Sequence, residues 1–203
     1  MGWFRNTFGP FKKEVWTEVS KQLGAQFIDG GFWKKDKIRY QHKNWVIEMD
    51  TYSTGGKNSK TYTRLRTCYI TLDHFQFRMY EENILSPWSK KLGLQDIQIG
   101  IADFDDKYML KSNNIETQTH KLLKSTSIRE LIKSVDGIRL SIQDYEGFFF
   151  SKSPSNLQLI YFEERGILKN KQKITNLFAL FCLILDQLVE IKSANEEDPK
   201  FNL

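Results

Sequence analysis

The stretch that decides the fold runs from Asn44 to Tyr80 and reads NWVIEMDTYSTGGKNSKTYTRLRTCYITLDHFQFRMY. Successive side chains of a β-strand point to opposite faces, so residues two apart share a face. Two alternating runs flank the segment 54–60, which is rich in Gly, Asn and Ser, residues that favour turns. The pattern predicts a long β-hairpin with a third strand attached over 75–79.

The charges of this hairpin indicate its register. Pairing that is symmetric about Lys57 places Glu48 opposite Arg66 and Asp50 opposite Arg64, two pairs of opposite sign. Such pairs stabilise a sheet, whereas a slip by one residue would turn both arginines toward the apolar side. The remaining predicted partners are Tyr52 with Tyr62 on the polar face, and Met49 with Leu65 and Trp45 with Tyr69 on the apolar face.

Length and composition indicate a soluble protein with a packed core. The chain has 203 residues, of which 40% are hydrophobic and 14% aromatic, and its formal net charge is +5. This charge permits an acidic partner without requiring one. The N-terminal sequence lacks the features of a signal peptide, and the apolar run 177–185 is about half as long as a membrane-spanning helix. We therefore expect a cytoplasmic protein.

Amphipathic periodicity predicts a helix near each end of the chain. The first covers 10–23, with Pro10 at its start, an apolar stripe that includes Phe11, and Gly24 as its stop. The second covers 171–191 and is apolar nearly all round, as deeply buried helices are. Capping patterns that begin at Asn113 and Ser127 predict two further helices. Other strands are predicted over 25–28, 37–40, 97–101, 108–111, 138–143, 148–151 and 157–162.

The strands occur in blocks and do not alternate strictly with helices. This order indicates an α+β fold in which antiparallel sheets are covered by long N- and C-terminal helices. A change of pattern near residue 102 allows two similar subdomains, a helix with a β-meander over 1–102 and a strand-helix-helix-hairpin-strand-helix unit over 103–192. The same pattern is compatible with one domain. The polar tail 193–203 is expected to fray.

Motifs for catalysis, metal binding and phosphate binding are incomplete in this sequence. The segment 55–59, GGKNS, lacks the earlier glycine and the following helix of a phosphate-binding loop. Asp103, Asp105 and Asp106 resemble part of a calcium loop, without its glycine and closing glutamate. The three histidines lack zinc-ligand spacing. We expect no catalytic residue, metal or cofactor, while an enzyme remains an open alternative.

Two surfaces are predicted to bind a partner. The first is the polar face of the hairpin, which carries Glu48, Asp50, Tyr52, Tyr62, Arg64 and Arg66. The second is the aromatic N-terminus, which carries Trp3, Phe4 and Phe8. The first hypothesis is a non-enzymatic interaction domain that binds another protein through one of these surfaces.

The same residues allow two alternative functions, and they raise the question of nucleic-acid binding. An enzyme or binder of an anionic small molecule would use Asp50, Arg64 and Arg66 in a pocket. A peripheral membrane module would use the N-terminal aromatics beside the lysines of the first helix. Tyrosines beside arginines are also typical of proteins that bind single-stranded nucleic acid. Nucleic acid is not the expected partner, because the hairpin carboxylates partly cancel the arginines.

The segment 104–150 places Phe104, Asp105 and Tyr108 before a leucine-rich helix, a second helix and a short hairpin. The helix positions are Leu122, Leu123 and Leu131, and the hairpin covers 138–150. This order resembles uncharacterised bacterial domain-of-unknown-function proteins, whose pattern is an F-(D/N)-x-x-F strand, two helices and a hairpin. Tyr108 stands in place of the second phenylalanine. The resemblance implies a bacterial protein and no particular activity.

Overall fold

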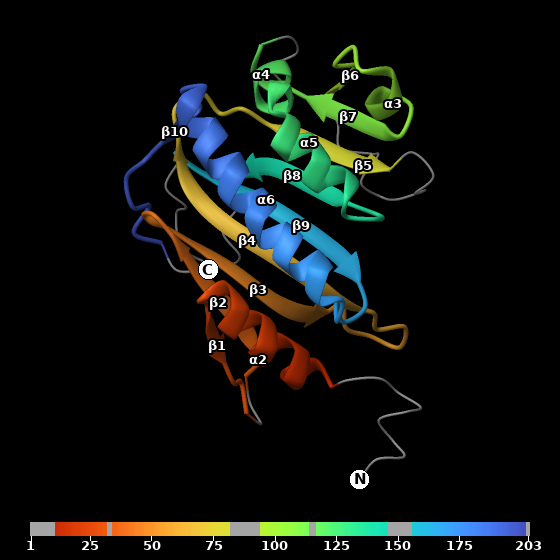
Figure 1. The fold of residues 1–203 in the computed structure, drawn as a ribbon, viewed down its shortest axis with the longest axis vertical. Helices are drawn as coiled ribbons and strands as arrows, with labels where there is room; N and C mark the ends of the chain where they lie inside the picture. The colour runs from red at the N-terminus through yellow and green to blue at the C-terminus, as the bar shows by residue number, and fades with distance from the viewer. Residues whose placement is uncertain (1–10, 32–33, 82–93, 114–116, 146–155, 202–203) are drawn as a thin grey trace.

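One antiparallel sheet of ten strands organises the protein (Figure 1). The computed structural model describes residues 11–31, 34–81, 94–113, 117–145 and 156–201. Five helices accompany the sheet in these residues, so the fold is α+β with a large antiparallel sheet.

The helices and strands of the described residues have the following bounds. The helices are α2 (Lys12–Leu23), α3 (Ala102–Asp105), α4 (Gln118–Lys124), α5 (Thr126–Lys133) and α6 (Lys171–Glu190). The strands are β1 (Gln26–Ile28), β2 (Lys37–His42), β3 (Trp45–Ser53), β4 (Thr61–Thr71), β5 (Phe77–Glu81), β6 (Gln95–Ile97), β7 (Tyr108–Ser112), β8 (Arg139–Asp144), β9 (Leu157–Arg165) and β10 (Ala194–Asn195).

The order of the strands interleaves the two halves of the chain. It is β1-β2-β3-β4-β9-β8-β5-β7-β6, with β10 paired to β4. The prediction that the third strand attaches to the hairpin is therefore wrong. Both edges of β4 are already occupied, because β9 pairs with it from Tyr62–Arg165 to Ile70–Leu157 and β3 and β10 pair on the other side. Strands from 1–102 and from 103–192 thus share one sheet.

The predicted register of the β3–β4 hairpin is confirmed. Glu48 pairs with Arg66, Asp50 with Arg64, Tyr52 with Tyr62 and Met49 with Leu65. This ladder ends at the pair of Glu48 and Arg66. Trp45 and Tyr69 are therefore not partners of each other, and Trp45 pairs with His42 of β2 while Tyr69 pairs with Gln158 of β9.

An apolar row crosses eight strands on one face of the sheet. Its members are cross-strand partners in sequence and are all buried: Ile38, Met49, Leu65, Phe162, Leu140, Met79, Leu110 and Ile97. The buried apolar side chains of α2, α4, α5 and α6 belong to the same core cluster. Figure 1 shows α2, α5 and α6 lying across this face, with α6 running diagonally over β4 and β9. The core therefore lies between the helices and one face of the sheet.

The helix α6 supplies the largest helical share of this core. Eight of its residues are buried, and the side chain of Asn170 accepts a hydrogen bond from the backbone N–H of Lys173 at its start. Among the described residues, α6 is long and apolar enough to cross a membrane, and 44% of its most apolar window is buried inside the protein. A core helix of a soluble protein meets the same criteria, so this finding does not distinguish the two.

The helix α2 packs beside α6 and contributes a fully buried tryptophan. The indole Nε1 of Trp16 donates to the carbonyl oxygen of Leu168 at 2.9 Å. The helix ends at Gly24, whose φ of 66° lies in the left-handed region that glycine adopts without strain. Phe11, predicted on the buried stripe, is instead 59% exposed because it precedes the first helical turn.

Several local predictions differ from the structure. The side chain of Asn113 bonds the backbone of Gln76 and His74, so it does not cap α4. The helix α5 is capped by Ser125, which accepts from Ile128, instead of by Ser127. Ser, Thr and Asn side chains bond whichever backbone groups lie within reach, so Asn113 bonds the neighbouring segment, while the N-cap residue of α4, Thr117, makes no side-chain capping bond.

Two predictions in the second half of the chain concern the tail after α6 and the hairpin after β8. Residues 194–195 form β10 and pair with Thr71 and Ile70 of β4, where the sequence predicts a frayed tail. A short strand finds a free stretch of the β4 edge there, because the β3–β4 ladder ends at Arg66. The second arm of the hairpin predicted over 138–150 lies outside the described residues, and β8 pairs with β5 and β9.

Candidate functional site

A polar row crosses the other face of the sheet, opposite the core. Cross-strand partners share a face, so the register places these residues side by side: Arg39, Glu48, Arg66, Tyr161, Ser141, Arg78, Lys111 and Asp96. We call this face the polar face. The six hairpin residues predicted as a binding surface, Glu48, Asp50, Tyr52, Tyr62, Arg64 and Arg66, all lie on it, because they alternate with Met49 and Leu65 of the core.

Glu48 is neutralised by residues of β2 and not by its partner on β4. Lys37 Nζ lies 2.8 Å from Oε2 of Glu48, and Arg39 Nε lies 3.0 Å from Oε1. The glutamate is fully buried beneath these two longer side chains. The predicted ion pair with Arg66 is replaced, although the two residues are cross-strand partners.

Asp50 binds both arginines of β4. Arg64 Nε and Nη2 contact Oδ1 and Oδ2 of Asp50 at 2.6 and 3.0 Å, and Arg66 Nη2 contacts Oδ2 at 3.0 Å. Only 4% of Asp50 is exposed. A carboxylate that accepts three hydrogen bonds from two guanidinium groups has little capacity left for a substrate proton, so the geometry disfavours Asp50 as a catalytic base.

The tyrosines form a second cluster at the turn end of the hairpin. The rings of Tyr52 and Tyr62 stack with centroids 5.3 Å apart, and Arg64 Cζ lies 5.1 Å from the Tyr52 ring centroid. Oη of Tyr52 and Oη of Tyr161 both donate to Oε2 of Glu163, at 2.6 and 2.9 Å. These contacts hold the aromatic pair in one position on the sheet.

Burial, and then the neighbouring carboxylate of Glu163, raise the pKa of Tyr52 to about 12. The pKa of Tyr161 is raised as well, by burial and by the charge of Glu163. The neutral phenol of each tyrosine therefore persists in the folded protein above the pH at which a free tyrosine ionises.

Alkaline pH is expected to weaken the fold through Tyr52. The unfolded chain loses this proton near pH 10 and the folded chain near pH 12, so stability is full below pH 10 and falls as the pH rises from about 10 to about 12. Urea unfolding at a series of pH values measures this slope. Tyr52→Phe should flatten part of it, whereas a slope identical to that of the unmodified protein would contradict the assignment.

Four residues of this site were not predicted from the sequence. Lys37 and Arg39 alternate with Ile38 in the strand predicted over 37–40, which is a signal that they share a face opposite the core. Tyr161 and Glu163 gave a weaker signal, because the stretch 157–162 reads as apolar on both faces. Their place beside Tyr52 depends on β9 pairing with β4, which no local pattern indicates.

The second predicted surface lies outside the described residues. Trp3, Phe4 and Phe8 belong to 1–10, so their contacts are not part of this site. In the described part of the chain, no group of three or more His, Cys, Asp and Glu side chains has a geometry that could hold a metal ion. Asp105, part of the predicted calcium-like fragment, instead accepts hydrogen bonds from the backbone N–H groups of residues 99–101.

Three cations lie at the same end of the hairpin as the tyrosine pair, and none of them has a carboxylate partner among the described residues. Arg165, the cross-strand partner of Tyr62, is exposed on the polar face, and Lys57 and Lys60 are exposed in the loop of the hairpin. Within the described ranges, no carboxylate lies at salt-bridge distance from any of the three. We call Tyr52, Tyr62, Arg64, Arg165, Lys57 and Lys60 the hairpin-end patch.

Comparison with known proteins gives a fold and no family. No family model matches this chain, and no curated protein matches it. Among solved structures, the crystal structure of the mycobacterial trehalose monomycolate transport factor A, TtfA, superposes with a TM-score of 0.53 over 91% of this chain and 97% of that chain. The two sequences are 9% identical over this match, so the likeness shows a shared fold alone.

Proposed function

We propose that this chain is a cytoplasmic, non-enzymatic interaction domain of a bacterial protein, and that the hairpin-end patch binds an acidic surface of a partner protein. The observation that carries the proposal is a rigid aromatic pair, Tyr52 and Tyr62, at the end of the hairpin where three cations lack a carboxylate partner within the described part of the chain. Tyrosine and arginine are the side chains that most often dominate the binding energy of protein interfaces.

Rigidity supports this proposal. Two strands carry the tyrosines, Glu163 holds Tyr52 through its hydroxyl, and Asp50 holds Arg64 through two hydrogen bonds. Side chains that are already ordered lose little conformational entropy on binding, so more of the contact energy appears as affinity. The buried carboxylates thus support the patch and do not act as ligands.

The sign of the charge selects the partner. Asp50 and Glu163 are occupied by neighbouring side chains, whereas Lys57, Lys60 and Arg165 are exposed and have no ion pair within the described ranges. A protein surface rich in Asp and Glu complements this charge and would be steered toward it. In the described residues, the hairpin carboxylates are all engaged by cations, which disfavours the enzyme hypothesis.

The arrangement of the sheet is compatible with this role. We propose that the helices at the two ends of the chain cover the apolar face and leave the polar face to the partner (Figure 1). Membrane contact through Trp3, Phe4 and Phe8 remains the alternative.

Zero-length carbodiimide cross-linking tests the proposal, because it joins a lysine directly to a carboxylate that it contacts. The tagged protein is cross-linked in lysate and the joined peptides are sequenced. We expect Lys57 and Lys60 to be joined to Asp or Glu residues of one partner protein. Cross-links of the partner to other surfaces only would overturn the proposal.

Two charge-reversal variants, one in the hairpin-end patch and one at a distant surface, test whether the patch itself binds the partner. With the partner purified, Lys57→Glu/Lys60→Glu/Arg165→Glu should weaken binding about tenfold or more, since three attractive charges become repulsive. Lys121→Glu/Lys124→Glu/Lys192→Glu changes the net charge equally at a distant surface and should bind nearly as the unmodified protein does. If the two triple variants lost the same amount of affinity for the partner, binding would depend on net charge alone, and the hairpin-end patch would be refuted as the binding site.

A further inference from the structure

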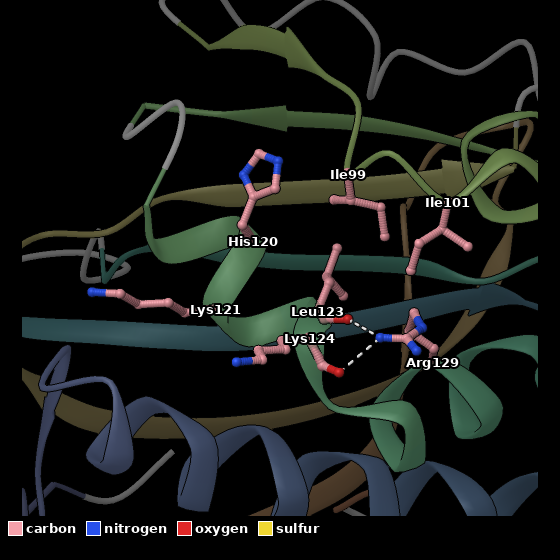
Figure 2. Close-up of a pocket in the computed structure, with 7 residues that line it drawn as sticks. All are labelled: Ile99, Ile101, His120, Lys121, Leu123, Lys124 and Arg129. Atoms are coloured by element: carbon pink, nitrogen blue, oxygen red, sulfur yellow. Dashed lines mark hydrogen bonds between the residues drawn. The ribbon is translucent and has the colours of Figure 1, made fainter.

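A basic pocket lies at α4, at the end of the molecule away from the hairpin loop (Figures 1 and 2). Its volume is about 460 Å³, within the range of small-molecule sites. Three apolar side chains, Ile99, Ile101 and Leu123, form one part of its lining, and Figure 2 shows them pointing toward one another. The remaining lining residues are His120, Lys121, Lys124 and Arg129. No acidic residue of the described chain lines this pocket.

Arg129 is held in place by the end of α4. Its Nη1 donates to the carbonyl oxygens of Leu123 and Lys124, and its Nη2 donates to Oγ1 of Thr126 at 3.1 Å. Carbonyl groups at a helix C-terminus attract a positive charge, so the guanidinium is fixed at the pocket wall. These contacts supply partial negative charge only. The carboxylate of Asp103 also feels the charge of Arg129, but its hydrogen bond is with Lys133, so the guanidinium has no carboxylate bonded to it among the described residues.

His120 lines the pocket with its ring, which points away from Ile101 and Arg129 in Figure 2. Its Nδ1 is shielded from solvent and has no hydrogen-bond partner among the described residues. An atom shielded in this way is not reached from the pocket, so His120 contributes ring surface to the lining and not a hydrogen bond.

The two lysines stand at the border with a second hollow. Lys121 and Lys124 also line a cavity of about 430 Å³ together with Gln187, Glu190, Ile191 and Lys192. In Figure 2 both lysine side chains extend along α4, away from Ile101. Both lysines are exposed, so their ammonium groups meet solvent at this border. The two lysines thus stand at the edge of the first pocket, on the side of the second cavity, which also carries the carboxylate of Glu190.

We infer that this pocket binds a single-chain amphiphile whose head group is a carboxylate. The alkyl chain would lie among Ile99, Ile101 and Leu123, and the carboxylate would lie beside Arg129, with Lys121 and Lys124 adding positive charge at the edge of the pocket. A chain of this kind satisfies both halves of the lining, whereas an inorganic anion leaves the isoleucines exposed and a neutral lipid leaves the cations without a counterion. The inference concerns a surface other than the hairpin-end patch and stands without it.

Calorimetric titration of the purified chain with acetate, hexanoate, octanoate and octylammonium tests the inference. Each buried methylene should tighten binding about fourfold, so octanoate should bind about tenfold or more tightly than hexanoate. Acetate and octylammonium should show no saturable binding. Equal affinities for hexanoate and octanoate, or binding of octylammonium as tight as that of octanoate, would overturn the inference.

Substitutions distinguish octanoate binding in the pocket from binding that depends only on the net charge of the protein. Lys121→Glu/Lys124→Glu should weaken octanoate binding about tenfold or more, whereas Lys57→Glu/Lys60→Glu, with the same change in net charge, should leave it within about twofold. Ile101→Trp should fill the apolar end and abolish binding while all cations remain. Circular dichroism and the thermal midpoint identify any variant that fails to fold, and Ile99→Trp then replaces Ile101→Trp. Octanoate binding that survives both the charge reversal and the filled pocket would refute the site.

Sedimentation with lipid vesicles distinguishes binding of a free amphiphile from binding to a membrane surface. Vesicles of phosphatidylglycerol carry anionic head groups on packed chains, and sedimentation measures binding of the protein to them. We expect octanoate to bind in solution and the vesicles to sediment little protein. Sedimentation that requires Lys121 and Lys124, without saturable octanoate binding, would assign the cations to a membrane surface and overturn the inference.

Discussion

Asp50→Ala is expected to lower the free energy of unfolding by about 2–3 kcal/mol. The substitution leaves Arg64 and Arg66, whose side chains are 25% and 13% exposed, without their shared carboxylate. Breaking a buried pair by removing one partner costs about 3–5 kcal/mol, and the partial exposure of the arginines lets water recover part of this. For a chain of this length the midpoint of thermal unfolding should fall by about 4–12 °C.

Urea or thermal unfolding measures the loss, and Glu18→Ala provides its control. Glu18 also pairs with a cation, Lys171 at 2.5 Å, but both side chains are about half exposed at 51% and 43%. Exposed pairs contribute about 0–1 kcal/mol, so this variant should be nearly as stable as the unmodified protein. If Asp50→Ala and Glu18→Ala proved equally mild, the charge network of the polar face would be a solvated surface and not a structural element.

Trp16→Ala is expected to have the largest effect on stability, about 3–5 kcal/mol. The side chain is fully buried in the core cluster, and its truncation leaves a cavity that neighbouring side chains fill only in part. It also removes the donor to the carbonyl oxygen of Leu168. Trp16→Phe keeps most of the ring but not this hydrogen bond, so it should cost only about 1–3 kcal/mol.

The same unfolding measurements separate packing from hydrogen bonding at this position. Phe11→Ala is the matched control, because it truncates an aromatic side chain at the start of the same helix where 59% is exposed. It should change the free energy of unfolding by about 0.5 kcal/mol or less. A loss from Trp16→Ala no greater than that from Phe11→Ala would mean that α2 is not docked on the core.

Local chemistry explains the predictions that succeeded. The register of β3 and β4 follows from alternation and from the signs of four charges within about 20 residues of chain, so Tyr52 meets Tyr62 as expected. The boundaries of α2 and α6 follow from apolar periodicity and from caps such as Gly24. Each of these depends on residues that are close in sequence, where few alternatives compete.

The partners of the buried charges could not be predicted in the same way. Sequence neighbours pair Glu48 with Arg66, but the folded sheet offers Glu48 two cations of β2 and leaves Arg66 to Asp50. A carboxylate bonds whichever cations reach it with the best geometry, and diagonal neighbours on adjacent strands compete with direct partners. The outcome depends on three strands at once.

The sequence by itself determined the α+β class, the two faces of each strand and the hairpin that carries Tyr52, Tyr62, Arg64 and Asp50. Only the tertiary structure decided that β9 lies between β4 and β8, which brings Glu163 to Tyr52 and Arg165 to Tyr62. It also decided that α4 and the segment 99–101 line an open basic pocket. The reason is physical: alternation and charge act over a few residues, whereas the order of strands is chosen by how all apolar faces are buried together.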